Sequence, residues 1–131
     1  MGAKKMKKLL EALAASGRQW STVVWAGVGH GSELELVRGL GASRLVLLEP
    51  HPLLQSRLRE KCAASANETV LPLALAAGAG DAVLHLVSNP LKSGLLPCEP
   101  LFARLPNLKP AGTAETGTLG LRGTVLTRWP Q

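Results

Sequence analysis

The run VVWAGVGHGS at residues 23–32, together with LVLLEP at residues 45–50, decides the fold of this 131-residue chain. In the first run, apolar residues enter a turn that has glycine at every second position. In the second, an apolar run ends on a single carboxylate, Glu49. In doubly wound α/β domains, such glycines let the backbone approach a nucleoside, and an acid at the next strand tip accepts from the ribose hydroxyls. The two runs therefore predict an α/β domain that binds a nucleoside-type ligand.

The spacing of Gly27, Gly29 and Gly31 narrows the ligand class. A dinucleotide-binding turn has its third glycine one position later, and Ser32 stands there. The spacing thus favours a nucleoside over NAD. Two alternatives remain open: the glycines form a tight strand-to-helix turn without a ligand, and Glu49 is a surface acid ahead of a helix that begins with proline.

The composition excludes several classes of protein. A hydrophobic share of 46% is typical of a globular chain and not of a disordered one. With three Trp, one Phe and no Tyr, the chain lacks the aromatics of a stacking platform for single-stranded nucleic acid. The net charge of +6 comes in part from a lysine cluster in residues 4–8. We expect a solvated helix end there, and we do not expect a nucleic-acid partner.

Cysteine use and hydropathy bear on the compartment. Cys62 and Cys98 have neither CxxC spacing nor a nearby histidine, so we expect no metal site and no disulfide framework. This favours a reducing, cytoplasmic location. No apolar run reaches the length of a membrane span, and Glu11 interrupts the apolar start where a secretory signal would continue.

The hydrophobic pattern predicts alternating helices and strands, joined as parallel strands in the order 3-2-1. The expected strands cover residues 21–26, 44–49, 69–73 and 82–87, and the expected helices cover residues 4–15, 32–39 and 52–67. We expect Leu9, Leu10 and Leu13 to share the buried face of the first helix, and Val23 and Val24 to centre a buried strand.

Two further details concern the helices. Ser32 and Glu35 have the spacing of a capping box at the start of the second helix. In the third helix, Leu54, Leu58 and Cys62 lie four residues apart and are expected to face inward.

The predicted organisation has three parts. Residues 1–17 form a basic amphipathic helix, residues 18–87 form the α/β domain, and residues 88–131 form a loop rich in proline and glycine with an edge-strand tail. We expect a helical turn near residues 99–104 and one or two edge strands within residues 113–127. The outer edge of the first strand is left unpaired. We expect the tail from Thr113, a second copy of the chain or another subunit to cover it.

Three motifs, in order over residues 22–87, resemble the class I S-adenosylmethionine-dependent methyltransferases of the FkbM type: the glycine turn, EPHP at residues 49–52 and PLALA at residues 72–76. The resemblance implies the N-terminal, cofactor-binding half of a Rossmann-like, doubly wound, mostly parallel sheet. It places the glycine turn against the methionine and ribose of S-adenosylmethionine, Glu49 on the ribose hydroxyls and Ala76 beside the adenine. The cofactor-binding residues that it implies are Ala26, Gly27, Val28, Gly29, Gly31, Glu49, Pro50 and Ala76.

Trp25 and Ala77 depart from that family pattern, because both stand where the family has acids. These departures favour the alternative of an inactive methyltransferase-like scaffold or protein-interaction module. A basic nucleic-acid-binding module is a third hypothesis, carried by the lysines of residues 4–8. No catalytic residue and no methyl acceptor is assigned.

Overall fold

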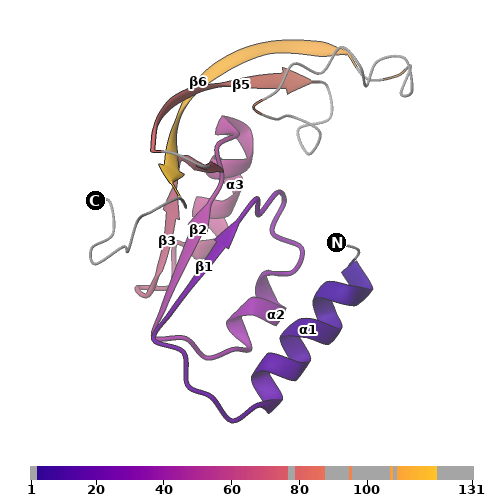
Figure 1. Ribbon diagram of the computed structural model, residues 1–131, viewed down its shortest axis with the longest axis vertical. Helices are drawn as coiled ribbons and strands as arrows, with labels where there is room; N and C mark the ends of the chain where they lie inside the picture. The colour runs from indigo at the N-terminus through magenta and orange to yellow at the C-terminus, as the bar shows by residue number, and fades with distance from the viewer. Residues whose placement is uncertain (1–2, 77–78, 88–94, 96–106, 108, 121–131) are drawn as a thin grey trace.

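The computed structural model describes residues 3–76, 79–87, 95, 107 and 109–120. Figure 1 shows a mixed α/β fold in which helices pack on a small parallel sheet and a second, arched sheet lies above its end. The elements, in chain order, are α1 (Ala3–Ala15), β1 (Thr22–Ala26), α2 (Leu34–Arg38), β2 (Arg44–Leu48), α3 (Pro52–Cys62), β3 (Glu68–Leu71), β4 (Leu73–Ala76), β5 (Gly80–Val87) and β6 (Pro110–Gly120).

The first sheet has the order β1-β2-β3, and both of its strand pairs are parallel. This confirms the predicted strand order and direction. Thr22 pairs with Arg44 at one end of the β1–β2 ladder, and Ala26 pairs with Leu48 at the other. The central strand β2 is buried over four of its five residues, as expected for a parallel strand covered on both faces.

The side chains of β2 contribute to two hydrophobic clusters, one on each face of the sheet, because successive side chains of a strand point to opposite sides. Leu45 and Leu47 pack with residues of the helices and of the glycine turn. Val46 and Leu48 pack with Leu119 of β6. The second sheet therefore covers the face of β2 that the helices leave free.

The helices confirm some predicted faces and correct others. Leu54, Leu58 and Cys62 of α3 are all buried, as predicted. On α1, Leu10 is buried but Leu9 is exposed. The prediction for Leu9 was wrong because the stripe that packs inward runs through Met6 and Leu10.

The first strand is not the buried strand that was predicted. Val24 is 40% exposed in the middle of β1, and among the described residues β1 pairs only with β2. Val24 lies level with Val46, on the face that β6 covers at β2. The cover does not extend over Val24, so β1 is a half-exposed edge strand.

The predicted strand at residues 69–73 is divided at Pro72. β3 ends at Leu71, and β4 begins at Leu73 in the other sheet. Proline carries no N–H for a strand ladder, so it separates the two pieces.

The expected edge strands of the tail are also corrected. β6 is the central strand of the second sheet, parallel to β4 and antiparallel to β5. β6 therefore folds together with β4 and β5, and residues 121–127 of the expected edge strands lie outside the described residues. The expected turn at residues 99–104 lies outside the described residues, as do Ala77 and Cys98.

Two predicted helix ends differ from the structure. α2 begins at Leu34, its N-cap residue Glu33 makes no side-chain capping bond, and the Ser32 hydroxyl donates to the Glu33 carboxylate instead. The capping box was wrong because the turn continues through Gly31, whose carbonyl accepts from Leu34 N. α3 ends at Cys62 and not near Asn67, whose carbonyl already accepts from Leu45 N beside the sheet.

Candidate functional site

The turn between β1 and α2 requires its glycines. Gly27, Gly29 and Gly31 have φ values of 68°, 65° and 74°. In this left-handed region an L side chain brings its Cβ close to the following carbonyl oxygen, which costs free energy. Glycine at every second position of this turn is therefore explained by the backbone conformation alone, before any ligand is considered.

The surroundings of the glycines differ. A Cβ added at Gly31 would lie 2.8 Å from Leu58 Cδ2, so this glycine lets the turn rest directly on α3. A Cβ added at Gly27 would meet no atom within 4 Å. The backbone at Gly27 thus borders open space, which a ligand can occupy.

Glu49 follows β2 directly, at the carboxyl end of the parallel sheet, and is 5% exposed. Its Oε1 atom accepts a hydrogen bond from Gly29 N at 2.8 Å, and its Oε2 atom accepts one from His51 N at 3.0 Å. The structure thus brings together the acid and the glycine turn that the sequence singled out. Each carboxylate oxygen has a second lone pair, so the group keeps acceptor capacity.

His51 and Gln55 stabilise the chain around Glu49 through contacts that were not predicted from the sequence. His51 is the N-cap residue of α3, and its Nδ1 atom accepts from Leu53 N at 3.2 Å. Burial lowers the pKa of His51, and the nearby charge of Glu49 opposes that effect. Gln55 Nε2 donates to Pro50 O at 3.0 Å. Proline at the first helical position marks residue 51 as a cap, but histidine is not among the preferred capping residues.

The other residues implied by the resemblance are placed as follows. Ala26 ends β1, and Pro50 lies between Glu49 and His51 with its carbonyl engaged by α3. Val28 is buried in the hydrophobic cluster that Leu45 and Leu47 form with the helices, here called the helix-side cluster. Its side chain therefore packs into the core beneath the turn. Ala76 ends β4 and pairs with Gly120 in the second sheet.

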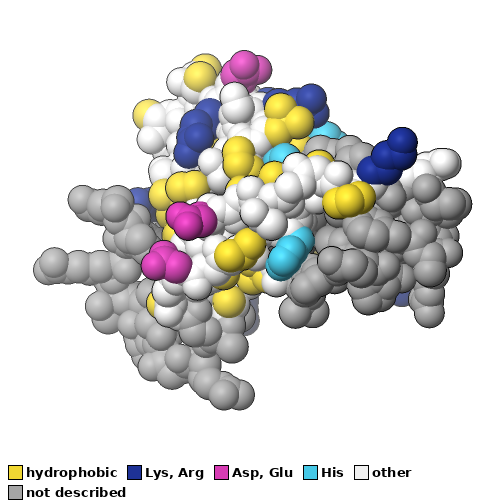
Figure 2. Space-filling view, turned by 90° about the horizontal axis from the view of Figure 1, so that it is seen from above, with side chains coloured by type: hydrophobic (Ala, Val, Ile, Leu, Met, Phe, Trp, Pro, Cys, Tyr) yellow, Lys and Arg dark blue, Asp and Glu magenta, His cyan; other side chains and the backbone are white. Residues whose placement is uncertain are grey.

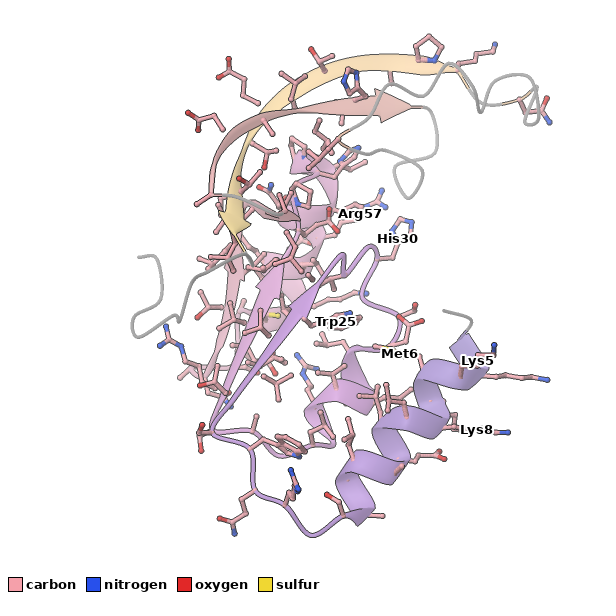
Figure 3. The ribbon with its side chains drawn as sticks, viewed as in Figure 1. Lys5, Met6, Lys8, Trp25, His30 and Arg57 are labelled. Carbon is pink, nitrogen blue, oxygen red and sulfur yellow. The ribbon has the colours of Figure 1, made fainter. Side chains whose placement is uncertain are left out.

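A cationic group borders the turn on the side of α3. Lys61 Nζ donates to His30 O at 2.6 Å, and Arg57 NH1 lies 3.5 Å from His30 Nδ1. Figure 3 shows His30 and Arg57 side by side beyond the end of β1. Arg57 and Lys61 are both exposed on α3, and the sequence contains no signal for their approach to the turn.

Cys62 does not contribute a reactive group. It is a free, buried cysteine at the end of α3. Burial is the main cause that raises the pKa of its thiol. Because the thiolate is the nucleophilic form, Cys62 packs as a small apolar side chain.

The described residues contain no group of three or more His, Cys, Asp or Glu side chains placed to hold a metal ion. Within the same part of the chain, no helix is both long enough and apolar enough to cross a membrane. Comparison with known proteins finds no match to this chain among protein-family models, curated proteins or solved structures.

Proposed function

We propose that this chain is a methyltransferase-like domain of the FkbM type that binds S-adenosylmethionine on a Rossmann-like, doubly wound sheet. The observation that carries the proposal is the 2.8 Å hydrogen bond from Gly29 N to Glu49 Oε1. It joins the turn after the first parallel strand to an acid after the second, which is where α/β domains hold the ribose of a nucleoside.

The residues present fit such a ligand in two respects. Gly27 leaves open space beside the turn for the methionine and ribose portions, and the remaining lone pairs of Glu49 accept from ribose hydroxyls. When bound, the cofactor supplies an electrophilic methyl group. Trp25 does not replace the missing acid, because its side chain packs against the helix-side cluster. We expect each missing charge-assisted hydrogen bond to cost about 1.5–3 kcal/mol of binding free energy.

Calorimetric titration tests this proposal. S-adenosylmethionine and S-adenosylhomocysteine are titrated into the wild type, Glu49→Gln and the control Glu60→Gln, which changes an exposed acid on α3. We expect binding that is weakened about tenfold or more in Glu49→Gln and unchanged in Glu60→Gln. Thermal unfolding of the three proteins shows whether Glu49→Gln keeps its fold. A folded wild type that binds neither ligand at millimolar concentration refutes the proposal.

A second candidate, a scaffold that pairs with a second copy of the chain, is favoured by the open edge of β1. An apolar groove of about 300 Å³ lies between α1, β1 and α2, and its lining includes Met6, Trp20 and Val24. Within the described residues nothing pairs with the outer edge of β1. An exposed strand edge is a template for pairing with another chain, and two-fold dimers are the commonest closed assemblies.

Size-exclusion chromatography coupled to light scattering measures the molar mass in solution and so tests whether two copies of the chain form this dimer. If copies pair through β1, Val24→Lys converts a dimer into a monomer, because a charge on an edge strand blocks pairing. Val83→Lys, which places the same charge on the 46%-exposed Val83 of β5, leaves the dimer intact. A wild type that is monomeric at every concentration rules this candidate out, and dissociation by Val83→Lys alone places the contact on the other sheet.

A further inference from the structure

His30, Arg57 and Lys61, here called the rim cluster, surround one side of the glycine turn. Arg57 and Lys61 lie one helical turn apart on α3, so their side chains leave the same face of the helix. Lys61 Nζ would lie 3.7 Å from a Cβ built at Gly31. Lys61 therefore contacts the same turn that Glu49 holds through Gly29 N.

Within the described part of the chain, most of the donors of the rim cluster make no hydrogen bond. An ammonium has three N–H donors, and Lys61 directs one of them to His30 O. A guanidinium has five, and the contact of Arg57 with the cluster is the 3.5 Å approach to His30 Nδ1. Arginine only donates, so in this contact the Nδ1 atom of His30 is the acceptor.

The rim cluster also lacks acids. Among the described residues, no carboxylate lies within ion-pair distance of Arg57 or Lys61, whereas Arg38 pairs with both Glu35 and Glu68. A favourable interaction with the end of the helix dipole accounts for a lysine in the last turn of α3. It does not account for Arg57 in the middle of the helix, beside the turn.

Figure 2, which looks onto the molecule from above, shows Lys, Arg and His side chains among the hydrophobic side chains of this face. In Figure 3, the labelled His30 and Arg57 lie beyond the end of β1, below the arched second sheet. Because Lys61 donates to the carbonyl of His30 within the glycine turn, the rim cluster lies beside the turn to which the proposed function assigns a ligand.

We propose that His30, Arg57 and Lys61 bind an oxyanion, a carboxylate or a phosphate group, beside the glycine turn. Guanidinium and ammonium groups with free donors form charge-assisted hydrogen bonds with such groups. The anion can come from two sources. One is the amino-acid carboxylate of S-adenosylmethionine, and this source rests on the proposed function. The other is an acidic group of a separate substrate, and this source is independent of the proposed function.

Titration with pyrophosphate at low ionic strength tests the site without any nucleoside. The variants are Arg57→Gln and Lys61→Gln, and the matched control is Arg59→Gln, which removes the same charge from an exposed position on the same helix. We expect binding to be about tenfold weaker in Arg57→Gln and Lys61→Gln than in the wild type, and unchanged in Arg59→Gln. Arg57→Gln is the cleaner variant because Lys61 also holds the turn through His30 O.

Two nucleosides distinguish the sources. S-adenosylhomocysteine carries the amino-acid carboxylate, and 5′-methylthioadenosine lacks it. If the cofactor supplies the anion, Arg57→Gln weakens binding of the first and leaves the second unchanged. If a separate substrate supplies it, Arg57→Gln weakens pyrophosphate binding but neither nucleoside.

The two proposals fail separately. Pyrophosphate binding that depends on Arg57 in a protein that binds neither nucleoside supports the oxyanion site and refutes the proposed function. Pyrophosphate binding that is absent, or equal in Arg57→Gln and Arg59→Gln, overturns the oxyanion site whatever the nucleosides do.

Discussion

Glu49 accepts two hydrogen bonds within the fold and is also proposed to bind the ligand, so a single substitution changes both the fold and the binding site. Its Oε1 atom holds Gly29 N, and its Oε2 atom holds His51 N, so the carboxylate joins the turn to the start of α3. In Glu49→Gln the side-chain amide places a donor where one of these two N–H groups needs an acceptor. Loss of ligand binding in this variant is therefore informative only when the fold is measured in the same protein.

The sequence predicted the position of Glu49 but not its contacts. An apolar run that ends at the first charged residue, with proline after it, marks a strand end through local signals. The hydrogen bond to Gly29 depends on how two strands pair, and the approach of Lys61 to His30 depends on how α3 packs. Such contacts join residues far apart in the chain, and no local pattern encodes them.

The cap of α3 predicts a pH dependence. His51 Nδ1 accepts from Leu53 N, so the folded protein needs this nitrogen unprotonated, and burial lowers the pKa of His51 below its ordinary 6.5. The unfolded chain takes up this proton near pH 6.5, and the folded chain does so only at lower pH. The stabilisation is complete above pH 6.5 and is lost as the pH falls below it.

Urea unfolding at pH 7.5 and pH 5.5 measures this effect. Asparagine is a good cap that does not titrate, so His51→Asn loses less stability than the wild type between the two pH values. His51→Ala lowers the free energy of unfolding at pH 7.5 by about 0.5–2 kcal/mol. Equal pH dependence in wild type and His51→Asn would exclude this role.

The glycine turn gives a matched pair of substitutions. Gly27→Ala and Gly31→Ala each force a left-handed residue, at a cost of about 1–2 kcal/mol. Gly31→Ala also places its Cβ 2.8 Å from a methyl group of Leu58, which is itself fully buried, and overpacking adds about 1–3 kcal/mol. We expect chemical unfolding to rank Gly31→Ala as clearly the less stable protein. Equal losses would mean that the turn can lift from α3.

At the scale of elements, Arg38 connects α2 to β3. Its Nε and NH2 atoms each donate to the Glu68 carboxylate at 2.8 Å, and NH2 also reaches Lys61 O at 3.1 Å. The hydrogen bonds from Arg38 are the main cause that lowers the pKa of Glu68, and the pairing raises the pKa of Arg38. A five-residue helix is too short to be stable alone, so this bidentate pair helps to hold α2 in place.

Glu68→Gln and Glu35→Gln compare two partners of the same arginine. The Glu68 side chain is 5% exposed and that of Glu35 is 83% exposed. We expect Glu68→Gln to lower the free energy of unfolding at pH 7 by about 2 kcal/mol, and Glu35→Gln to lower it by less than about 1 kcal/mol.

Acid titration extends the same comparison. Because the folded pKa of Glu68 is lowered, its stabilisation is present above the ordinary value of 4.5 and is lost as the pH falls through the folded pKa. Urea unfolding between pH 6 and pH 3 should therefore show a shallower decline in Glu68→Gln than in the wild type. A similar decline in both would contradict the assignment.

The elements that the sequence predicted well are those with local signals. Periodic apolar residues marked α1 and α3, and continuous apolar runs marked β1 and β2. β6 was missed as a central strand because its threonines, glycines and alanines carry a weak pattern. Its partners, β4 and β5, are set by pairing across distant parts of the chain.

At the scale of the whole molecule, the two sheets share a core at β2. Leu119 of β6 is buried with Val46 and Leu48, so residues 110–120 contribute to the stability of the parallel sheet. Leu119→Ala should lower the free energy of unfolding by about 2–4 kcal/mol within a single cooperative transition. Val83→Ala, at an exposed position of β5, should change it by less than about 1 kcal/mol. Urea unfolding followed by tryptophan fluorescence measures both, and two separate transitions would show independent sheets.

The central position of β6 has a consequence for the order of folding. Leu73 pairs with Gly117, whereas Thr22 pairs with Arg44 and Leu45 with Glu68, so the pairing of β4 with β6 closes a longer loop than either strand pair of the parallel sheet. Shorter loops cost less entropy to close and form sooner. On the ribosome, β1 to β3 emerge before β6 is synthesised, and in that interval Val46 and Leu48 present a bare apolar face. The nascent chain is therefore most prone to aggregation, and most in need of a chaperone, just before its last described strand is made.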